Sequence, residues 1–293
     1  MRSWGILAVG LAAVLAGIGL GSSPFDAWAD PAPLARSPDG RPMVLTFGES
    51  FDRLRTPWGG GRPNDHVWRT TYGDGAHSDV SSRTLKGNKE VQLYVDPTMT
   101  DGQGRSLGLN PFAVHDGVLD IVADRTKPQN LAGLSGYGFT SGLISSQPSF
   151  SQLYGYFEAR LKLPEGKGLW PAFWMLPADL SWPPEIDVME SIGDPKTAFM
   201  SVHSAMMKTQ GVEVHASSAG FHTYAVAWDE KKVIFFLDGV EEGRAQTPAD
   251  MHKPMYVLAN LAMGGDWAGT PTPVTPFPAK FSIDYIRIYR FAS

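Results

Sequence analysis

The sequence predicts an all-β sandwich, and three observations support this class. Short apolar segments alternate with turn residues along most of the chain, which has 32 Gly and 23 Pro among its 293 residues. One segment, FEARLKL, shows the strand period of two, with Phe157 on one face and Glu158 and Arg160 on the other. No long stretch carries the period of an amphipathic helix, so two packed sheets are favoured.

Six segments have the composition of strands. They are VQLYV, GVLDIVA, GYFEARLKL, TYAVAWD, KVIFFLDG and FSIDYIRIYR. The DEKK sequence between the fourth and fifth of them is typical of a hairpin turn, and LDG ends the fifth with a turn signal. The polar segment 52–75 is long, and it is therefore predicted to be a functional surface loop.

The first 29 residues are predicted to be an export signal. Arg2 precedes an apolar run at 5–20, and Ala27-Trp28-Ala29 fits a small-x-small cleavage site. A membrane anchor is the alternative, but the run is shorter than the roughly 20 residues that span a bilayer. We expect a flexible leader at 30–42, one domain at 43–293, and a secreted or periplasmic protein without membrane contact after cleavage.

The composition limits the classes of partner. The chain has no cysteine, so its core must hold the fold without disulfides. The net charge is −5 and the basic residues are scattered, so a monomer without a nucleic-acid partner is expected. Nine Trp, nine Tyr and fifteen Phe are compatible with stacking on the apolar faces of sugars.

The segment WPPEIDVMES places three carboxylates in an apolar run, at i, i+2 and i+5. A helix would put Glu185 and Glu190 about 140° apart. A regular strand would put Glu185 and Asp187 on one face and Glu190 on the other. All three converge only if one extra residue is absorbed, as a β-bulge at Val188 and Met189 would do. The spacing therefore predicts a bulged strand that carries a row of acids.

A row of acids can have a structural or a functional explanation. The structural one is a solvated sheet face, or a set of carboxylates paired with scattered Arg and Lys. Unpaired carboxylates that are buried together are costly and repel one another, so the row needs partners or a use. Trp170 and Trp174 lie just upstream, in GLWPAFWMLP. Carboxylates beside indole rings suggest a sugar site, where cleavage of a glycosidic bond needs one acid and one nucleophile or base.

The chain resembles glycoside hydrolase family 16, the laminarinase and lichenase group, including its bacterial exopolysaccharide glycanases. EIDVME matches the five-step motif E-[I/L]-D-x-x-E, whereas the lichenase branch has a four-step form without the bulge. GNKEVQLY, GLNPF, GVLDIVA, TSGLISS, YGYFEARLKLPEGKGLWPAFWMLP, SVHS, ANLAMGGDWAG and SIDYIRIY recur in the family order. The resemblance implies a concanavalin A-like β-jelly roll of two antiparallel sheets with an open concave cleft, and it makes 43–293 the catalytic domain.

By motif position, the resemblance implies that Glu185 is the nucleophile, Glu190 the general acid/base and Asp187 a hydrogen-bonding partner that tunes the nucleophile. Retaining glycosidases hold the two carboxyl groups about 5–5.5 Å apart and form a glycosyl–enzyme ester. The neighbouring charges and partial burial are expected to raise the pKa of Glu190, so that it begins the reaction protonated.

Seven further positions match substrate-binding positions of the family. Trp170 and Trp174 correspond to tryptophans beside the cleaved bond, and Trp267 to a loop tryptophan at the cleft edge. The others are Asn88, the charged pair Glu158 and Arg160, and His203. Five of them also have a simpler interpretation: core packing for Trp170 and Trp174, an exposed ion pair for Glu158 and Arg160, and a structural role for His203.

The resemblance also implies a structural calcium ion on the convex side. Asp284 would be its side-chain ligand, with the backbone of Gly117 and of the Glu49 region. Calcium takes six to eight oxygen ligands, mostly backbone and water in this case, so the sequence signal is weak. Catalysis itself is expected to need no cofactor.

The predicted function is a retaining endo-β-glycanase that hydrolyses β-1,3 or mixed β-1,3/1,4 glucan, or a related exopolysaccharide. A transglycosylase on the same scaffold, or a glucan-binding protein without activity, is the alternative; the latter is disfavoured because all three acids are present. No G-x-S-x-G or H-E-x-x-H motif occurs, so a serine hydrolase and a zinc enzyme are unsupported. The sequence leaves the natural polysaccharide open.

Overall fold

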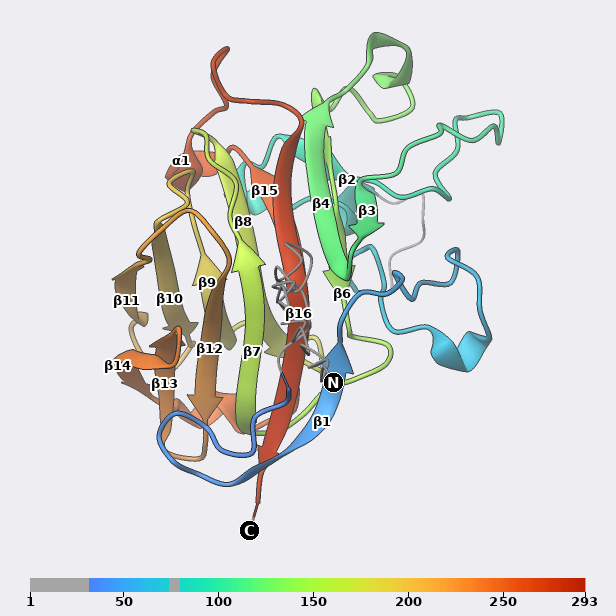
Figure 1. Cartoon of the computed structure of the whole chain (residues 1–293). Helices are drawn as coiled ribbons and strands as arrows, with labels where there is room; N and C mark the ends of the chain where they lie inside the picture. The colour runs from blue at the N-terminus through green and yellow to red at the C-terminus, as the bar shows by residue number, and fades with distance from the viewer. Residues whose placement is uncertain (1–31, 74–79, 293) are drawn as a thin grey trace, which may run out of the picture.

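Two β-sheets stacked face to face form the protein. The computed structural model describes residues 32–73 and 80–292, so the predicted export signal lies outside the described residues. Among them, no helix is long and apolar enough to cross a membrane. The only α-helix in these ranges is the single turn α1 (Gly265–Ala268). The predicted all-β class is confirmed (Figure 1).

The larger sheet has ten strands in the order β14-β13-β12-β7-β16-β4-β5-β2, with β1 paired to β16 and β3 to β4. All its pairs are antiparallel except β2 with β5. Figure 1 shows β16, in red, running through its middle. The strands are β1 (Met43–Glu49), β2 (Gln92–Tyr94), β3 (Phe112–His115), β4 (Val118–Arg125), β5 (Phe139–Ser141), β7 (Gly155–Lys162), β12 (His222–Trp228), β13 (Lys232–Leu237), β14 (Val240–Gln246) and β16 (Ala279–Phe291).

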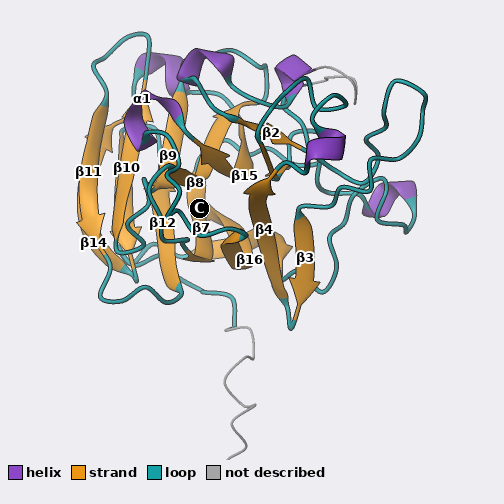
Figure 2. Ribbon diagram, turned by 90° about the horizontal axis from the view of Figure 1, so that it is seen from above, coloured by secondary structure: helices purple, strands orange, loops and turns teal. Residues whose placement is uncertain are grey.

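The smaller sheet is entirely antiparallel, and its strand order is β11-β10-β9-β8-β15-β6. Figure 2 gives the view from above. The strands are β6 (Leu143–Ser145), β8 (Leu169–Pro177), β9 (Glu185–Glu190), β10 (Thr197–His203), β11 (Gln210–His215) and β15 (Met255–Met263). Short 3₁₀ turns lie in the connections: η1 (Pro63–Asp65), η2 (Val80–Ser82), η3 (Lys86–Asn88), η4 (Pro128–Asn130) and η5 (Ala249–Met251).

The main core lies between the two sheets. Alternate residues of each strand point into it, such as Phe157 and Ile286 from the larger sheet and Phe173 and Val257 from the smaller one, all fully buried. Burial of one large apolar side chain contributes about 1.5–3 kcal/mol, so this layer stabilises the sandwich without disulfides. The opposite faces of the strands remain available for other roles.

A buried ion pair fixes the segment that lies beyond β6. Arg83 Nη2 donates to Asp96 Oδ2 at 2.9 Å, and Arg83 Nη1 donates to the Tyr94 carbonyl at 3.0 Å. Thr70 and Thr98 also donate to the Asp96 carboxylate. This network joins Thr70 and Arg83 to the end of β2 and to the residues that follow it.

Part of the segment predicted as a flexible leader is hydrogen-bonded. The Met43 amide donates to the Ala35 carbonyl, the Ser37 amide to the Arg41 carbonyl, and Arg41 pairs with Asp229 at 2.8 Å. These contacts join residues 35–43 to the turn that precedes β13.

Candidate active site

Strand β9 contains the predicted bulge. Phe173 of β8 pairs with Met189. The next residue of β8, Trp174, pairs with Asp187, so Val188 has no partner on β8. The pairing of β9 with β10 shifts at the same place. The extra residue in β9 is the one inferred from the i, i+2, i+5 spacing.

The bulge brings three acids to one face of β9. Val188 and Met189 both point into the core and are fully buried. Because these two consecutive residues share the inner face, Glu190 turns to the same side as Glu185 and Asp187. The row of acids therefore faces the concave side of the smaller sheet.

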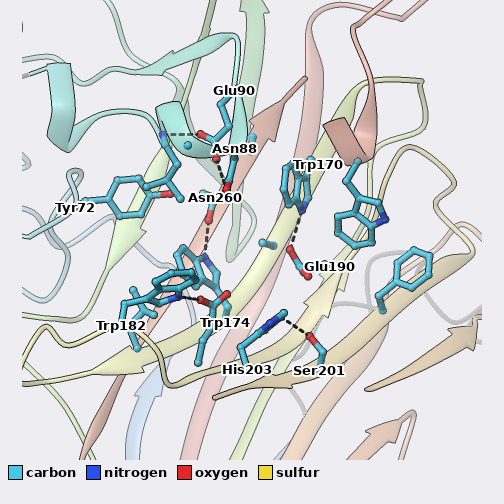
Figure 3. Close-up of a pocket in the computed structure, with 18 of the residues that line it drawn as sticks. Tyr72, Asn88, Glu90, Trp170, Trp174, Trp182, Glu190, Ser201, His203 and Asn260 are labelled. Carbon is cyan, nitrogen blue, oxygen red and sulfur yellow. Dashed lines mark hydrogen bonds between the residues drawn. The ribbon is translucent and has the colours of Figure 1, made fainter. Parts of the chain in front are cut away.

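A cavity of about 1110 Å³ lies over this face, and we call it the cleft. Of the residues predicted from the sequence, the cleft is lined by Glu185, Glu190, Asn88, Trp170, Trp174, His203 and Trp267. Further lining residues that the sequence did not single out include Tyr72, Glu90, Trp182, Phe199, Ser201 and Asn260 (Figure 3). Asp187 lies beneath this surface, at 1 % exposure.

Glu190 is held by an indole. Trp170 Nε1 donates to its Oε1 at 2.8 Å (Figure 3). Burial raises the pKa of Glu190 to about 7, and the charge of Glu185 adds to this shift while the Trp170 hydrogen bond opposes it. The expected direction is confirmed, although burial contributes more than the neighbouring charge. A carboxyl group with this pKa can exchange a proton near neutral pH.

Glu185 is also held by an indole, from the other side. Trp182 Nε1 donates to its Oε2 at 2.5 Å. Burial and the negative charge of Asp187 raise the pKa of Glu185 well above its usual range, while the Trp182 hydrogen bond and the charge of His203 oppose the shift. Glu185, Asp187 and His203 form one cluster, in which one carboxylate or imidazole atom of each residue lies within 4.8 Å of the others.

Asp187 is the buried centre of this set. Ser201 Oγ donates to its Oδ2 at 2.6 Å, and His203 Nε2 lies 3.0 Å from the same oxygen. Burial and the charge of Glu190 raise the pKa of Asp187 against the opposing effect of His203. The hydrogen bond to Asp187 in turn raises the pKa of His203. A protonated His203 offsets part of the negative charge beside Glu185.

The floor of the cleft is fixed by a chain of hydrogen bonds. Trp174 Nε1 donates to Asn260 Oδ1 at 2.7 Å, and Asn260 Nδ2 donates to the Tyr94 hydroxyl at 3.0 Å. Trp174 is only 8 % exposed, so it packs against the floor and presents little surface to the cleft. Asn260, on β15, therefore fixes the orientation of the Trp174 side chain on β8.

One wall of the cleft is aromatic. The ring of Trp267, on α1, lies 5.3 Å from Trp170 and 5.0 Å from Phe199 in edge-on arrangements. Trp267 is 41 % exposed, as expected for a residue at a cleft edge. The Lys89–Asp266 pair, at 2.6 Å, joins α1 to the turn that carries Asn88.

Asn88 lies beside a buried carboxyl group. Its Nδ2 is 3.5 Å from Glu90 Oε1, and Gln92 Nε2 donates to Glu90 Oε2 at 2.6 Å. The Leu85 amide donates to the same oxygen. Burial raises the pKa of Glu90. This part of the cleft therefore offers amide and carboxyl groups that can bind hydroxyl groups.

Glu158 and Arg160 lie outside the cleft, which corrects the prediction that they bind substrate. Both are on β7 in the larger sheet, and their side chains point away from the core because Phe157 points into it. The Tyr289 hydroxyl donates to Glu158 at 3.2 Å, and Arg160 pairs with Asp284. The family motif was matched to β7, but β7 belongs to the larger sheet, whose outer face is the convex side and not the cleft.

The residues predicted to bind calcium are only partly assembled. Gly117 and the chain after Glu49 do meet, since a Cβ at Gly117 would lie 3.6 Å from the Ser50 carbonyl. However, the carboxylate of Asp284, the expected side-chain ligand, is paired with Arg160. Calcium binding stays a prediction.

The sandwich and its cleft of carboxylates between tryptophans have the architecture of a glycoside hydrolase. A family model for glycosyl hydrolases family 16 matches residues 110–287. The chain belongs to this family.

Relatives extend over most of the chain. It is 40 % identical over 252 residues to endo-1,3-1,4-beta-glycanase EglC, and 44 % identical over 253 residues to endo-1,3-1,4-beta-glycanase ExsH, both of Rhizobium meliloti (strain 1021). Each match covers 84 % of this chain and 52 % of the relative, so the chain spans about half the length of these relatives. The solved endo-beta-1,3-glucanase of Pyrococcus furiosus superposes with a TM-score of 0.70 at 28 % identity, over 89 % of this chain and 100 % of that one.

Proposed function

We propose that the protein is a retaining endo-β-glycanase that hydrolyses β-1,3 or mixed β-1,3/1,4 glucan by double displacement. The observation that carries the proposal is the bulge in β9, which turns Glu185 and Glu190 to one face of a cleft. Each carboxyl group accepts a hydrogen bond from a different indole, which fixes it from its own side. Double displacement needs a fixed nucleophile and a fixed acid, and retention follows when their carboxyl groups lie about 5–5.5 Å apart.

In the first step, Glu190 donates its proton to the glycosidic oxygen while Glu185 attacks the anomeric carbon. The bond between that carbon and the glycosidic oxygen breaks, the sugar on the leaving side departs, and an ester forms between Glu185 and the remaining sugar. Because burial raises the pKa of Glu190 to about 7, this group holds its proton in neutral solution for a substantial fraction of the time.

In the second step, Glu190 removes a proton from water, and the oxygen of that water attacks the anomeric carbon. The ester bond breaks and Glu185 is released as a carboxylate. Esterification removes the charge of Glu185, which is one of the causes that raise the pKa of Glu190. The pKa of Glu190 therefore falls in the intermediate, so that it is ionised and able to act as the base.

His203 and Asp187 act behind the nucleophile. Asp187 is buried next to Glu185, and Nε2 of the His203 imidazole lies 3.0 Å from the Asp187 carboxylate. A positive charge on His203 lowers the cost of two adjacent carboxylates, so Glu185 can ionise before it attacks. Ser201 completes the arrangement by donating to Asp187.

The polymer and its linkage are proposed from the cleft and the relatives. The cleft extends past the acids toward Asn88 on one side and toward Val212 and Glu213 of β11 on the other, as a polymer cut internally would need. EglC, ExsH and the Pyrococcus furiosus enzyme carry names for endo action on 1,3 or 1,3-1,4 linkages. The signal-like sequence at 1–29 supports action outside the cytoplasm.

The test is a panel of laminarin, lichenan, agarose, xyloglucan and a succinoglycan-type polymer, with sizing of the products and Glu185→Gln as the inactive reference. Laminarin or lichenan should fall rapidly in molecular mass and yield oligosaccharides with a retained anomeric configuration. Products longer than the donor would favour the transglycosylase instead. Binding without cleavage of any polymer in the panel would favour a glucan-binding protein.

A further inference from the structure

Trp182 has an unusual position for a residue so exposed. It precedes β9 by three residues, its side chain is 69 % exposed, and it lines the cleft. Its Nε1 is nevertheless only 2.5 Å from Oε2 of Glu185. An exposed indole has water as an alternative partner, so a lasting contact to the half-buried carboxyl group of Glu185 needs a local structure that holds it.

The loop before Trp182 supplies that structure. Asp179 accepts hydrogen bonds from both the amide and the hydroxyl of Ser181, at 3.0 and 2.7 Å. Lys253, from the turn before β15, donates to Asp179 at 2.8 Å and to Ser181 at 3.0 Å. At one and three residues before Trp182, the loop is therefore tied to a different part of the sandwich.

The orientation of the indole separates two roles. Its N–H end points to the carboxyl group of Glu185, so this edge of the ring is engaged. The rest of the exposed ring lies on the cleft surface and is free to contact the apolar face of a sugar. One side chain can thus act on the nucleophile through its nitrogen and on the substrate through its carbon surface.

On the basis of the proposed function, we propose that Trp182 is a positioning residue for the nucleophile: its N–H holds one oxygen of Glu185 as a hydrogen-bond acceptor, and its exposed ring forms the sugar-contacting wall beside that group. A hydrogen bond donated to a carboxylate favours the ionised form, which is the form that attacks. Bound sugar would cover the ring, exclude water and strengthen this bond at the moment of reaction.

Two substitutions separate the two roles. Trp182→Phe keeps an aromatic ring and removes the N–H, whereas Trp182→Gln keeps an N–H donor and removes the ring. We expect Trp182→Phe to lower kcat by at least about tenfold, since hydrogen bonds to charged groups are worth that much, and to change KM little. The acidic limb of its pH–rate profile should move to higher pH, because Glu185 without its donor is ionised only at higher pH. Trp182→Gln should raise KM and leave that limb close to its original place.

Trp267→Phe is the matched control, because Trp267 lines the same cleft and contacts rings. It keeps an aromatic ring, as Trp182→Phe does, and it should not move the acidic limb. The proposal is overturned if Trp182→Phe keeps the original kcat and pH profile, or if the Gln variant moves the acidic limb as far as the Phe variant does.

A second readout does not depend on activity. In ¹⁵N NMR spectra the indole N–H signal of Trp182, assigned by its loss in Trp182→Phe, should move as Glu185 titrates and should lose this dependence in Glu185→Gln. If the signal titrates but the protein has no glycanase activity, the proposed function is wrong and the contact between Trp182 and Glu185 still holds. A signal that ignores both pH and Glu185→Gln in an active enzyme would reject the role of Trp182 alone.

Discussion

Trp170 Nε1 donates a 2.8 Å hydrogen bond to Oε1 of Glu190, and this contact opposes the effect of burial on that carboxyl group. The indole stabilises the ionised form, while the buried environment favours the protonated form. The balance leaves the pKa of Glu190 at about 7. Trp170 therefore lowers the pH up to which Glu190, the proposed acid, remains protonated.

The first prediction concerns the basic limb of the pH profile of kcat/KM. Glu190 must be protonated for the first step, so kcat/KM should fall as pH rises through about 7. Trp170→Phe removes the hydrogen bond that lowers the pKa, so the basic limb should move to higher pH. Profiles of both proteins on one soluble glucan test this, and a variant whose basic limb stays in place would contradict the assignment.

The second prediction concerns the nucleophile. Glu185→Gln should abolish hydrolysis of laminarin or lichenan, by a factor of at least about 10³, because an amide cannot form the glycosyl ester. Its circular dichroism spectrum should match the original. It should also lower the pKa of Glu190, whose value includes a contribution from the charge of Glu185. Undiminished hydrolysis would end the nucleophile assignment.

The third prediction concerns the acid/base. Glu190→Ala should cleave β-glucosides that have a good leaving group in the first step, since such groups depart without a proton. The ester should then accumulate, because no base activates water. Azide needs no base, so adding it should restore turnover and give a β-glycosyl azide. If azide has no effect, Glu190 is not the residue that activates water.

The fourth prediction concerns stability. Asp96 and Arg83 are almost completely buried, so Asp96→Asn leaves a buried guanidinium without its counter-charge and should cost about 3–5 kcal/mol in unfolding free energy. Burial acts to raise the pKa of Asp96, but hydrogen bonds from Thr98 and the charge of Arg83 outweigh it and lower the pKa. This contribution is present above the unfolded pKa and lost as pH falls through the folded one. Urea denaturation measures the loss.

The exposed Asp101–Arg105 pair is the control for that experiment. Asp101→Asn should change the urea midpoint far less, because exposed ion pairs contribute little. Equal losses in the two variants would mean that burial of the Arg83 pair is not what makes it important.

The fifth prediction concerns a Ser–His–Asp arrangement on the other side of the molecule. Ser218 Oγ lies 3.0 Å from His222 Nε2, and His222 Nδ1 lies 2.6 Å from Asp238 Oδ2. Neither cavity described in the structure includes these residues, and the Thr223 amide also donates to Asp238. We interpret the set as a tie between two turns. Ser218→Ala should leave glucan hydrolysis unchanged, whereas His222→Ala should lower the melting temperature; loss of hydrolysis in the Ser variant would contradict this view.

The bulge was predictable because the strand period of two allows only one way for Glu185, Asp187 and Glu190 to converge. The errors at Glu158 and Arg160 have a different cause. Their alternation gave the correct face of β7 relative to its own core residues. The alternation of apolar and polar residues along one strand does not indicate which of the two sheets forms the concave side. That depends on pairings between strands distant in sequence, such as β7 with β16.

Other parts of the site left no local signal. Asn260 lies in β15, where all nine residues are buried, so its segment gives no sign of a face on the cleft. Trp182 stands in a Pro-rich loop, and that loop is hydrogen-bonded to Lys253, some seventy residues later in the chain. Such contacts follow from the assembled sandwich and not from the spacing of residues along one strand.

The unpartnered Val188 also bears on how this strand can change its length. Phe173 and Trp174 remain adjacent on β8 whether or not β9 carries the additional residue, so a single-codon deletion there would leave the flanking pairs in place. Glu185 and the displaced glutamate would then stand four positions apart in a regular strand and still look the same way. The insertion or deletion of one residue at this position therefore leaves the acids on the same face of β9. A deletion removes only the buried Val188 side chain.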